Sequence, residues 1–118
     1  ISYGQLVPAV LDAAAALADE GISAEVVDLR TLVPLDRRTV LDSVAKTRRA
    51  VVTHAAARFA GPGAEISALI HEELFGQLER PVRRVAGAFT PVPFAQSLER
   101  VHAPDASVIA ESVREVLA

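Results

Sequence analysis

The chain has 118 residues, of which 51% are apolar and 23% are charged, and its formal net charge is −3. This length suits one folded domain, and the lack of a basic excess gives no reason to expect a nucleic-acid partner. The absence of cysteine excludes disulfides, thiolate metal sites and a cysteine nucleophile, and no apolar run is long enough to span a bilayer. A cytoplasmic domain without a membrane partner is expected.

The chain contains no methionine and opens directly on the apolar stretch "ISYG". Translation therefore does not begin at Ile1 in our interpretation. We expect residues 1–118 to be one domain of a longer protein.

The first part of the chain alternates between strand and helix patterns. Ile1–Gly4 is a short apolar strand, and apolar residues at helical spacing predict a helix over Gln5–Glu20. The apolar positions expected to be buried are Val7, Val10, Leu11, Ala14, Leu17 and Ala18. Gly21 is placed to end this helix, and Ser23–Leu29 is rich in β-branched residues, as a strand is.

The stretch "DLRTLVPLD" leads from this strand into the next helix. Asp36 is a side-chain cap for a helix that runs to about Lys46, and Leu35 and Val40 have the spacing of a hydrophobic staple. Arg49–His54 is the third predicted strand.

The last part of the chain contains two further helices. The pattern predicts a helix over Gly63–Leu78, which buries Ile66, Leu69, Ile70, Leu74 and Phe75. Pro81–Gly87 is a fourth strand, whose arginines suggest a sheet edge or a covered interface. A long proline-containing connection follows, and Asp105–Ala118 is the closing helix, with Ile109, Val113, Val116 and Leu117 buried.

This alternation predicts the α/β class, with a parallel sheet between two layers of helices. Such sheets bind ligands at the carboxyl ends of their strands. Three features meet that description, namely Gly4-Gln5, Asp28-Leu29-Arg30, and His54 with the loop after it.

The loop "GPGAE", Gly61 to Glu65, places two glycines at a helix start, where free N–H groups can hold an anion. However, Ile66 stands where a dinucleotide fingerprint needs its third glycine, and Glu65 already complements the helix dipole. A structural turn is the favoured interpretation.

The histidines and charged residues have simple structural interpretations beside the functional ones. His54 is either a general base or a hydrogen-bonded spacer, and the spacer is favoured, as it is for His71 and His102, which have no partner at metal-ligand spacing.

Arg30 is interpreted as a buried-edge ion-pair partner and not as a substrate clamp; its possible counter-charges are Asp28, Glu65 and Glu99. The basic residues that flank the second helix are expected to form a solvated face, with an acidic docking partner as the minority interpretation: Arg37, Arg38, Lys46, Arg48 and Arg49. No set of residues here performs chemistry unaided, so we expect no catalytic, cofactor-binding or metal-binding residue in this chain.

Over its whole length the chain resembles the C-terminal domain of the β subunit of thiamine-diphosphate-dependent 2-oxo acid dehydrogenases, of the pyruvate or branched-chain type. The fold implied is that of the transketolase C-terminal domain. The resemblance is carried, in order, by "YG" (3–4), "GISAEVVDLRTLVPLD" (21–36), "SVAKTRRAVVTHAA" (43–56), "GPGAEISALIHEELF" (61–75), "PVRRVAG" (81–87), "TPVPFAQSLE" (90–99) and "PD" (104–105).

The resemblance sharpens the expected topology. The family's first strand, antiparallel to the others, is missing from residues 1–118, so we expect four parallel strands in the order 2-1-3-4 and one sheet position left open or covered by a neighbour. Ala55, Pro62 and the Arg37-Arg38 pair depart from the family pattern, which leaves room for a paralogue that acts on another 2-oxo acid.

The resemblance also implies a function. The thiamine diphosphate and Mg²⁺ of the parent enzyme are held by its α subunit, and the activating glutamate lies in the β subunit's N-terminal domain, so this domain alone is expected to bind no cofactor and to be inactive. Its implied roles are contact with the second β subunit and docking of the binding segment of the dihydrolipoyl acyltransferase. Because such segments tend to be basic, the expected docking residues are Glu72, Glu79, Glu111 and Glu115.

Two alternatives remain open from the sequence. One is a freestanding anion- or nucleotide-binding module that uses Gly4, His54 and the Gly61–Gly63 loop. The other is the same domain in a transketolase, a deoxyxylulose-phosphate synthase or an acetoin-cleaving enzyme.

Overall fold

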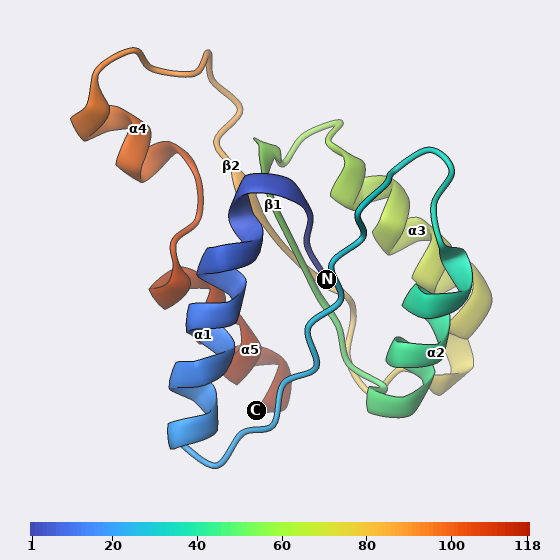
Figure 1. Cartoon of the computed structure of the whole chain (residues 1–118). Helices are drawn as coiled ribbons and strands as arrows, with labels where there is room; N and C mark the ends of the chain where they lie inside the picture. The colour runs from blue at the N-terminus through green and yellow to red at the C-terminus, as the bar shows by residue number, and fades with distance from the viewer.

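The computed structural model describes residues 1–118, and its helices form two layers with extended chain between them (Figure 1). The elements in chain order are η1 (Gly4–Leu6), α1 (Val7–Asp19), α2 (Arg37–Thr47), β1 (Val51–Ala57), α3 (Pro62–Leu74), η2 (Phe75–Gln77), β2 (Arg83–Gly87), α4 (Gln96–His102) and α5 (Ala106–Leu117). Helices α1 and α5 lie on one face of the extended layer, and α2 and α3 lie on the other. The predicted α/β class is confirmed.

The sheet contains two parallel strands, β1 and β2, whose register pairs Val51 with Arg83 and His54 with Ala86. Residues 1–3 run alongside β1, and residues 27–29 run alongside residues 1–3, without forming a ladder. Ser2 makes a single parallel bridge with Asp28, and the Thr53 N–H donates to the Ile1 carbonyl at 3.0 Å.

The prediction of four parallel strands was therefore wrong in its count, because the first and second predicted strands are extended segments joined by one bridge. The two segments lie side by side over only three residues each, 1–3 and 27–29. Gly4 has a φ of 61° and begins η1, so the pairing stops after Tyr3, and at the other end of the overlap Ile1 lies opposite Val27. Residues 23–26 have no extended segment beside them.

An apolar hollow of about 350 Å³ lies next to these unpaired residues. Its walls come from α1, α5, the 22–26 segment and the start of β1, and they include Leu17, Val26, Val51 and Val113.

Helix α1 is present where it was predicted, and Val10 and Leu17 are buried as expected, but the rest of its buried face differs. The buried residues of η1 and α1 are Leu6, Val10, Ala13 and Leu17, whereas Leu11 is 53% exposed and Ala18 is exposed. Six alanines make α1 apolar around most of its surface, so spacing alone does not choose the face. Gly21 follows the helix end with a φ of 81°, as expected.

Helix α2 begins as the capping pattern predicts. The Asp36 carboxylate accepts a hydrogen bond from the Thr39 backbone N–H at 3.0 Å and another from its hydroxyl at 2.7 Å. Val40 is fully buried and Leu35 packs against the same cluster, in agreement with the staple.

The later helices differ from expectation in three places. Helix α3 ends at Leu74, where the chain tightens into η2, so Phe75 is 78% exposed instead of buried. The connection expected to be irregular contains the short helix α4, which projects away from the two helical layers (Figure 1). In α5, which Asp105 caps through the Val108 N–H, Ile109 and Val116 are buried but Leu117 is 42% exposed.

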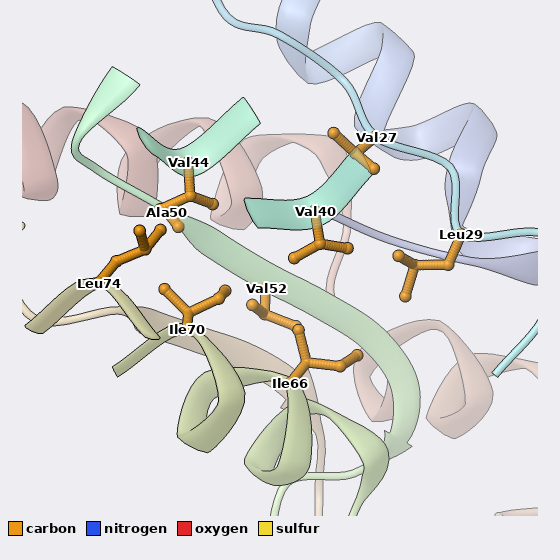
Figure 2. Close-up of a cluster of buried hydrophobic side chains, with 9 residues drawn as sticks. All are labelled: Val27, Leu29, Val40, Val44, Ala50, Val52, Ile66, Ile70 and Leu74. Atoms are coloured by element: carbon orange, nitrogen blue, oxygen red, sulfur yellow. The ribbon is translucent and has the colours of Figure 1, made fainter. Parts of the chain in front are cut away.

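Two apolar clusters hold the layers together. Figure 2 shows the larger one, in which side chains of α2, β1 and α3 meet those of the 27–29 segment: Val27, Leu29, Val40, Val44, Ala50, Val52, Ile66, Ile70 and Leu74. The smaller cluster joins η1 and α1 to α5. None of the helices is long and apolar enough to cross a membrane.

Candidate functional site

The carboxyl ends of the extended segments form the candidate site, because parallel strands bring their ends to the same edge of a sheet. Tyr3 and His54 lie together there, with stacked rings whose centroids are 5.8 Å apart. Asp28 lies beside Ser2 through the isolated bridge. His54 is thus in contact with Tyr3, the residue before the predicted Gly4-Gln5 feature, and Asp28 is adjacent in the sheet.

His54 is a buried residue whose two ring nitrogens both have backbone partners. Its Nε2 accepts a hydrogen bond from the Gly63 N–H at 2.9 Å, which fixes the proton on Nδ1, and Nδ1 donates to the Ala56 carbonyl at 3.0 Å. Burial lowers the pKa of His54 below its usual value, and the positive charge of Arg84 acts in the same direction. The neutral ring ties the end of β1 to the start of α3, in agreement with the spacer interpretation.

The two glycines of the 61–65 loop are explained by their packing against this ring. A Cβ on Gly63 would lie 2.4 Å from His54 Nε2, and a Cβ on Gly61 would lie 2.0 Å from the Ala57 carbonyl oxygen. Both distances are shorter than real Cβ contacts, so glycine is required by close approach and not by an unusual backbone angle.

This geometry weakens the anion-binding alternative. The Gly63 N–H, which an anion at the helix start would need, already donates to His54, and Glu65 occupies the first turn of α3. Ile66, at the position of the missing third glycine, is 3% exposed and belongs to the larger core cluster. The loop therefore serves packing.

Arg30 differs from its sequence interpretation in one respect. It does form an ion pair, with its Nε 2.6 Å from Asp28 Oδ2, so Asp28 and neither Glu65 nor Glu99 is the counter-charge. However, the Arg30 side chain is 84% exposed, because its backbone adopts a φ of 58° that turns it away from the sheet. The expected buried edge was wrong.

The other two histidines are also engaged with nearby backbone or hydroxyl groups. His71 Nδ1 lies 2.7 Å from the Ser67 carbonyl oxygen, its own helical neighbour, and His102 Nδ1 lies 3.5 Å from the Thr90 hydroxyl. No group of three or more acidic, histidine or cysteine side chains is close enough to hold a metal ion.

The basic residues that flank α2 form ion pairs with acids elsewhere in the chain. Arg37 reaches Glu73 at 2.8 Å, and Arg48 and Arg49 share Glu79 at 3.2 and 2.5 Å. Lys46 pairs with Glu25, and Arg38 pairs with Asp42 at 3.5 Å on the helix surface. The pairs with Glu73, Glu79 and Glu25 connect α2 and its flanking residues to α3, to the chain after it and to the 22–29 segment. The expected solvated face therefore also holds neighbouring elements together.

Three of the four expected docking acids have an intramolecular arginine partner. Glu79 holds Arg48 and Arg49, Glu111 lies 2.9 Å from Arg114, and Glu115 lies 2.5 Å from Arg83. Glu72 makes no ion pair. A basic partner at these positions has to compete with arginines that are already present.

Sequence reasoning missed one feature near the candidate site, an exposed apolar surface on the 88–102 segment and the loop after β1. We call it the apolar patch, and its exposed side chains are Phe59, Phe89, Val92, Phe94, Leu98 and Val101. The Phe59 and Phe89 rings meet edge to face, with centroids 5.0 Å apart. The signal that was available is the stretch "AFTPVPFAQSL", which places aromatic residues in a proline-containing connection without helical or strand spacing.

The family model of the transketolase C-terminal domain matches residues 1–109. The chain belongs to this family. The resemblance seen in the sequence is thereby confirmed, and the extended layer with helices on both faces is this family's domain.

Relatives of this transketolase C-terminal domain are β subunits. The chain is 47% identical over 118 residues to the pyruvate dehydrogenase E1 component subunit beta of Leifsonia xyli and 46% identical over 117 residues to that of Bacillus subtilis. It is 44% identical over 117 residues to the acetoin:2,6-dichlorophenolindophenol oxidoreductase subunit beta of Cupriavidus necator. These matches cover 99 to 100% of the chain but only 35 to 36% of each relative, so the chain spans about a third of their length.

The fold agrees with a solved structure named "Split gene transketolase, inactive beta4 tetramer". The TM-score is 0.82 at 27% identity, over 98% of this chain and 36% of that one. The similarity includes the arrangement of helices on both faces, although only two of the segments between them form a ladder in this chain.

Proposed function

We propose that the chain is the structural, dimerisation and docking domain of a β subunit in the decarboxylating component of a 2-oxo acid dehydrogenase. The parent enzyme would decarboxylate a 2-oxo acid oxidatively and pass the acyl group to lipoyl-lysine. The pyruvate dehydrogenase relatives support this parent reaction, and the candidate site supports a scaffold role, since both ring nitrogens of His54 are committed to backbone groups.

The apolar patch is the observation that carries the dimerisation role. Five of its six exposed apolar side chains lie on the 88–102 segment, Phe59 contacts Phe89, and Phe94 has no cover from its own chain at all. Large apolar side chains exposed in this number are typical of protein–protein contact sites. The second β subunit is the proposed occupant, in keeping with the name of the structural relative, which describes a tetramer of β chains.

Sedimentation of the 118-residue chain tests this contact. Phe94→Ser with Leu98→Ser should remove concentration-dependent association, because both side chains lose their apolar contact area. Val33→Ser is the matched control, since Val33 is 93% exposed in the loop before α2, far from α4 (Figure 1). Equal association of the double variant and the parent chain would contradict the proposal.

Docking of the acyltransferase segment is proposed at Glu72, Glu79, Glu111 and Glu115. Alanine at all four positions should weaken binding of a basic binding segment and reduce its salt dependence. Because Glu79 also holds Arg48 and Arg49, the Glu72→Ala single variant separates docking from folding. Unchanged affinity and salt dependence in the four-fold variant would remove this part of the proposal.

The proposed parent is longer than residues 1–118, because the chain spans only 35 to 36% of the length of the β subunits that it matches.

Thiamine diphosphate and Mg²⁺ are proposed to be held by other parts of the parent, namely the α subunits and the β subunit's N-terminal domain. The chain alone should show no thiamine-dependent turnover, while the native reading frame expressed with an α subunit should oxidise a 2-oxo acid. Turnover by the 118-residue chain alone would contradict the scaffold role.

An acetoin-cleaving parent is the second candidate. It is favoured by the 44% identity to the Cupriavidus necator acetoin oxidoreductase subunit, which is comparable to the identity with the pyruvate dehydrogenase subunits. Assays of the complete α/β enzyme with pyruvate, branched-chain 2-oxo acids and acetoin separate the two candidates, because only the preferred substrate should reduce an artificial electron acceptor efficiently.

A further inference from the structure

The far edge of β2 is a free edge of the sheet. Within the ladder, the Arg83 N–H donates to the Ala50 carbonyl at 3.0 Å, and the register places alternate residues of β2 toward β1. In a parallel strand the N–H and C=O groups of the intervening residues, here Arg84 and Ala86, point the other way. No further strand pairs with β2 on that side, so these groups are available to an added strand.

A basic hollow lies along this edge. It has a volume of about 430 Å³ and is bounded by Ser67 of α3 on one side and Glu115 and Val116 of α5 on the other. Four arginines line it, namely Arg58, Arg80, Arg83 and Arg84, against one carboxylate. This concentration of positive charge is unusual in a chain whose net charge is −3.

Two of these arginines, Arg58 and Arg84, have no carboxylate partner. Arg83 is paired with Glu115, and Arg80 donates to the Glu79 carbonyl oxygen and to the terminal oxygen of Ala118, whereas Arg84 donates only to the Arg58 carbonyl oxygen, at 3.3 Å. The Arg58 guanidinium forms no ion pair. Arg84 is half-buried, so its charge lacks both full hydration and a counter-charge.

The arginines are distributed over both faces of the sheet. Paired residues of neighbouring strands share a face, so Arg84 lies on the side of Val52, toward α3, and Arg83 lies on the side of Val51, toward α5. An extended segment that adds to β2 alternates its side chains between these same faces. Carboxylates at neighbouring positions of such a segment would therefore meet arginines on both sides.

We propose that the free edge of β2 and its arginine-lined hollow bind an extended, carboxylate-rich segment of a partner protein, which adds to the sheet as a further strand. Backbone hydrogen bonds to Arg84 and Ala86 would supply the pairing, and the arginines would select for acidic side chains. This surface goes beyond the proposed function, in which acids of this domain receive a basic segment. It is also separate from the apolar patch.

A labelled peptide of about six residues with pairs of adjacent glutamates flanked by threonines is a suitable probe, since adjacent residues of a strand face opposite sides and this length matches an ordinary strand. Fluorescence anisotropy with the folded 118-residue chain should show binding that weakens as salt is added. The same peptide with glutamine in place of glutamate should bind at least about tenfold more weakly, because it keeps the backbone groups and loses the charges.

Variants of the chain locate the site. Arg84→Glu and Arg58→Glu should each weaken binding of the acidic peptide by about tenfold or more, and Arg84→Gln should weaken it less. Arg100→Glu is the matched control, because Arg100 lies on α4 outside the hollow and makes no ion pair, so affinity should change by less than about twofold. Circular dichroism of each variant verifies that the chain is folded.

Amide signals provide the second readout. The acidic peptide should shift the Arg84 and Ala86 amides and slow their hydrogen exchange, as strand pairing requires. Equal losses from Arg100→Glu and Arg84→Glu would show non-specific charge attraction and overturn the proposal. Unperturbed Arg84 and Ala86 amides, or tighter binding of inorganic phosphate or an oligonucleotide than of the peptide, would also overturn it.

Discussion

The larger core cluster and the apolar patch have similar side chains but opposite environments. In the core, Ile70 and Val40 are completely buried between α2, β1 and α3 (Figure 2), whereas Phe94 and Val101 on the 88–102 segment face solvent. The difference arises from packing partners. Core residues lie on elements that pack against one another, whereas Leu98 and Val101, although at helical spacing, lie on α4, which projects away from the two helical layers. Apolar composition alone therefore does not identify the residues that stabilise this fold.

The largest contrast should come from truncating one side chain in each region. Ile70→Ala removes a fully buried side chain and should lower the free energy of unfolding by about 2–5 kcal/mol. Val101→Ala removes a side chain that is 77% exposed and should change it by less than about 0.5 kcal/mol. Urea denaturation measures both changes in unfolding free energy. Similar losses for the two variants would show that other parts of the chain cover the apolar patch.

The contact of Gly63 with His54 predicts the next largest effect on the core side. Gly63→Ala forces a Cβ into the ring and should cost about 1–3 kcal/mol of unfolding free energy. Gly76→Ala is the control, because nothing lies within 4 Å of a Cβ there and the change should be close to neutral.

A double-mutant cycle sharpens this test. If the ring is the obstacle, Gly63→Ala should cost less in a His54→Ala background than in the parent chain. A cost that is the same in both backgrounds would point to the backbone and away from His54.

The Asp105 cap marks the boundary between the exposed segment and the packed helix α5. Its carboxylate accepts a hydrogen bond from the Val108 N–H at 2.9 Å, so Asp105→Ala should lower the unfolding free energy by about 1 kcal/mol. Asp12→Ala, at an exposed position in the middle of α1, should have a smaller effect. Thermal unfolding compares the stability of the two variants, and equal losses would mean that the Asp105 cap does not stabilise the start of α5.

The smallest expected effect is a pH dependence of the stability, which arises from the buried residue His54. Because burial lowers the pKa of His54, the unfolded chain binds the proton more readily than the folded chain does, and stability should fall as pH drops below about 6.5. His54→Gln should remove this component. Persistence of the full slope in this variant would contradict the assignment to His54.

Local signals predicted much of the fold correctly. Asp36 and Asp105 cap the helices at the expected residues, Gly21 follows α1, and β2 matches the predicted fourth strand closely. Each of these features depends on residues within a few positions of one another, which is the range over which sequence patterns carry information.

The errors concern features that depend on packing between distant segments. The buried face of the alanine-rich α1 is chosen by α5, and the ion pairs of Arg48 and Arg49 with Glu79 need the end of α3 to lie against the start of β1. The contact between His54 and Gly63 likewise depends on how α3 returns over β1. Candidate residues could be named from the sequence, but their partners could not.

The fit between the His54 ring and the glycines that start α3 has a consequence for the variation of this domain through evolution. A larger residue at 63 can be accommodated only if the side chain at 54 becomes smaller or α3 moves outward, so these two positions should change together or not at all. A side chain at 61 would also meet the Ala57 carbonyl oxygen, so in homologous domains that lack the histidine, residue 63 should be freer to vary than residue 61.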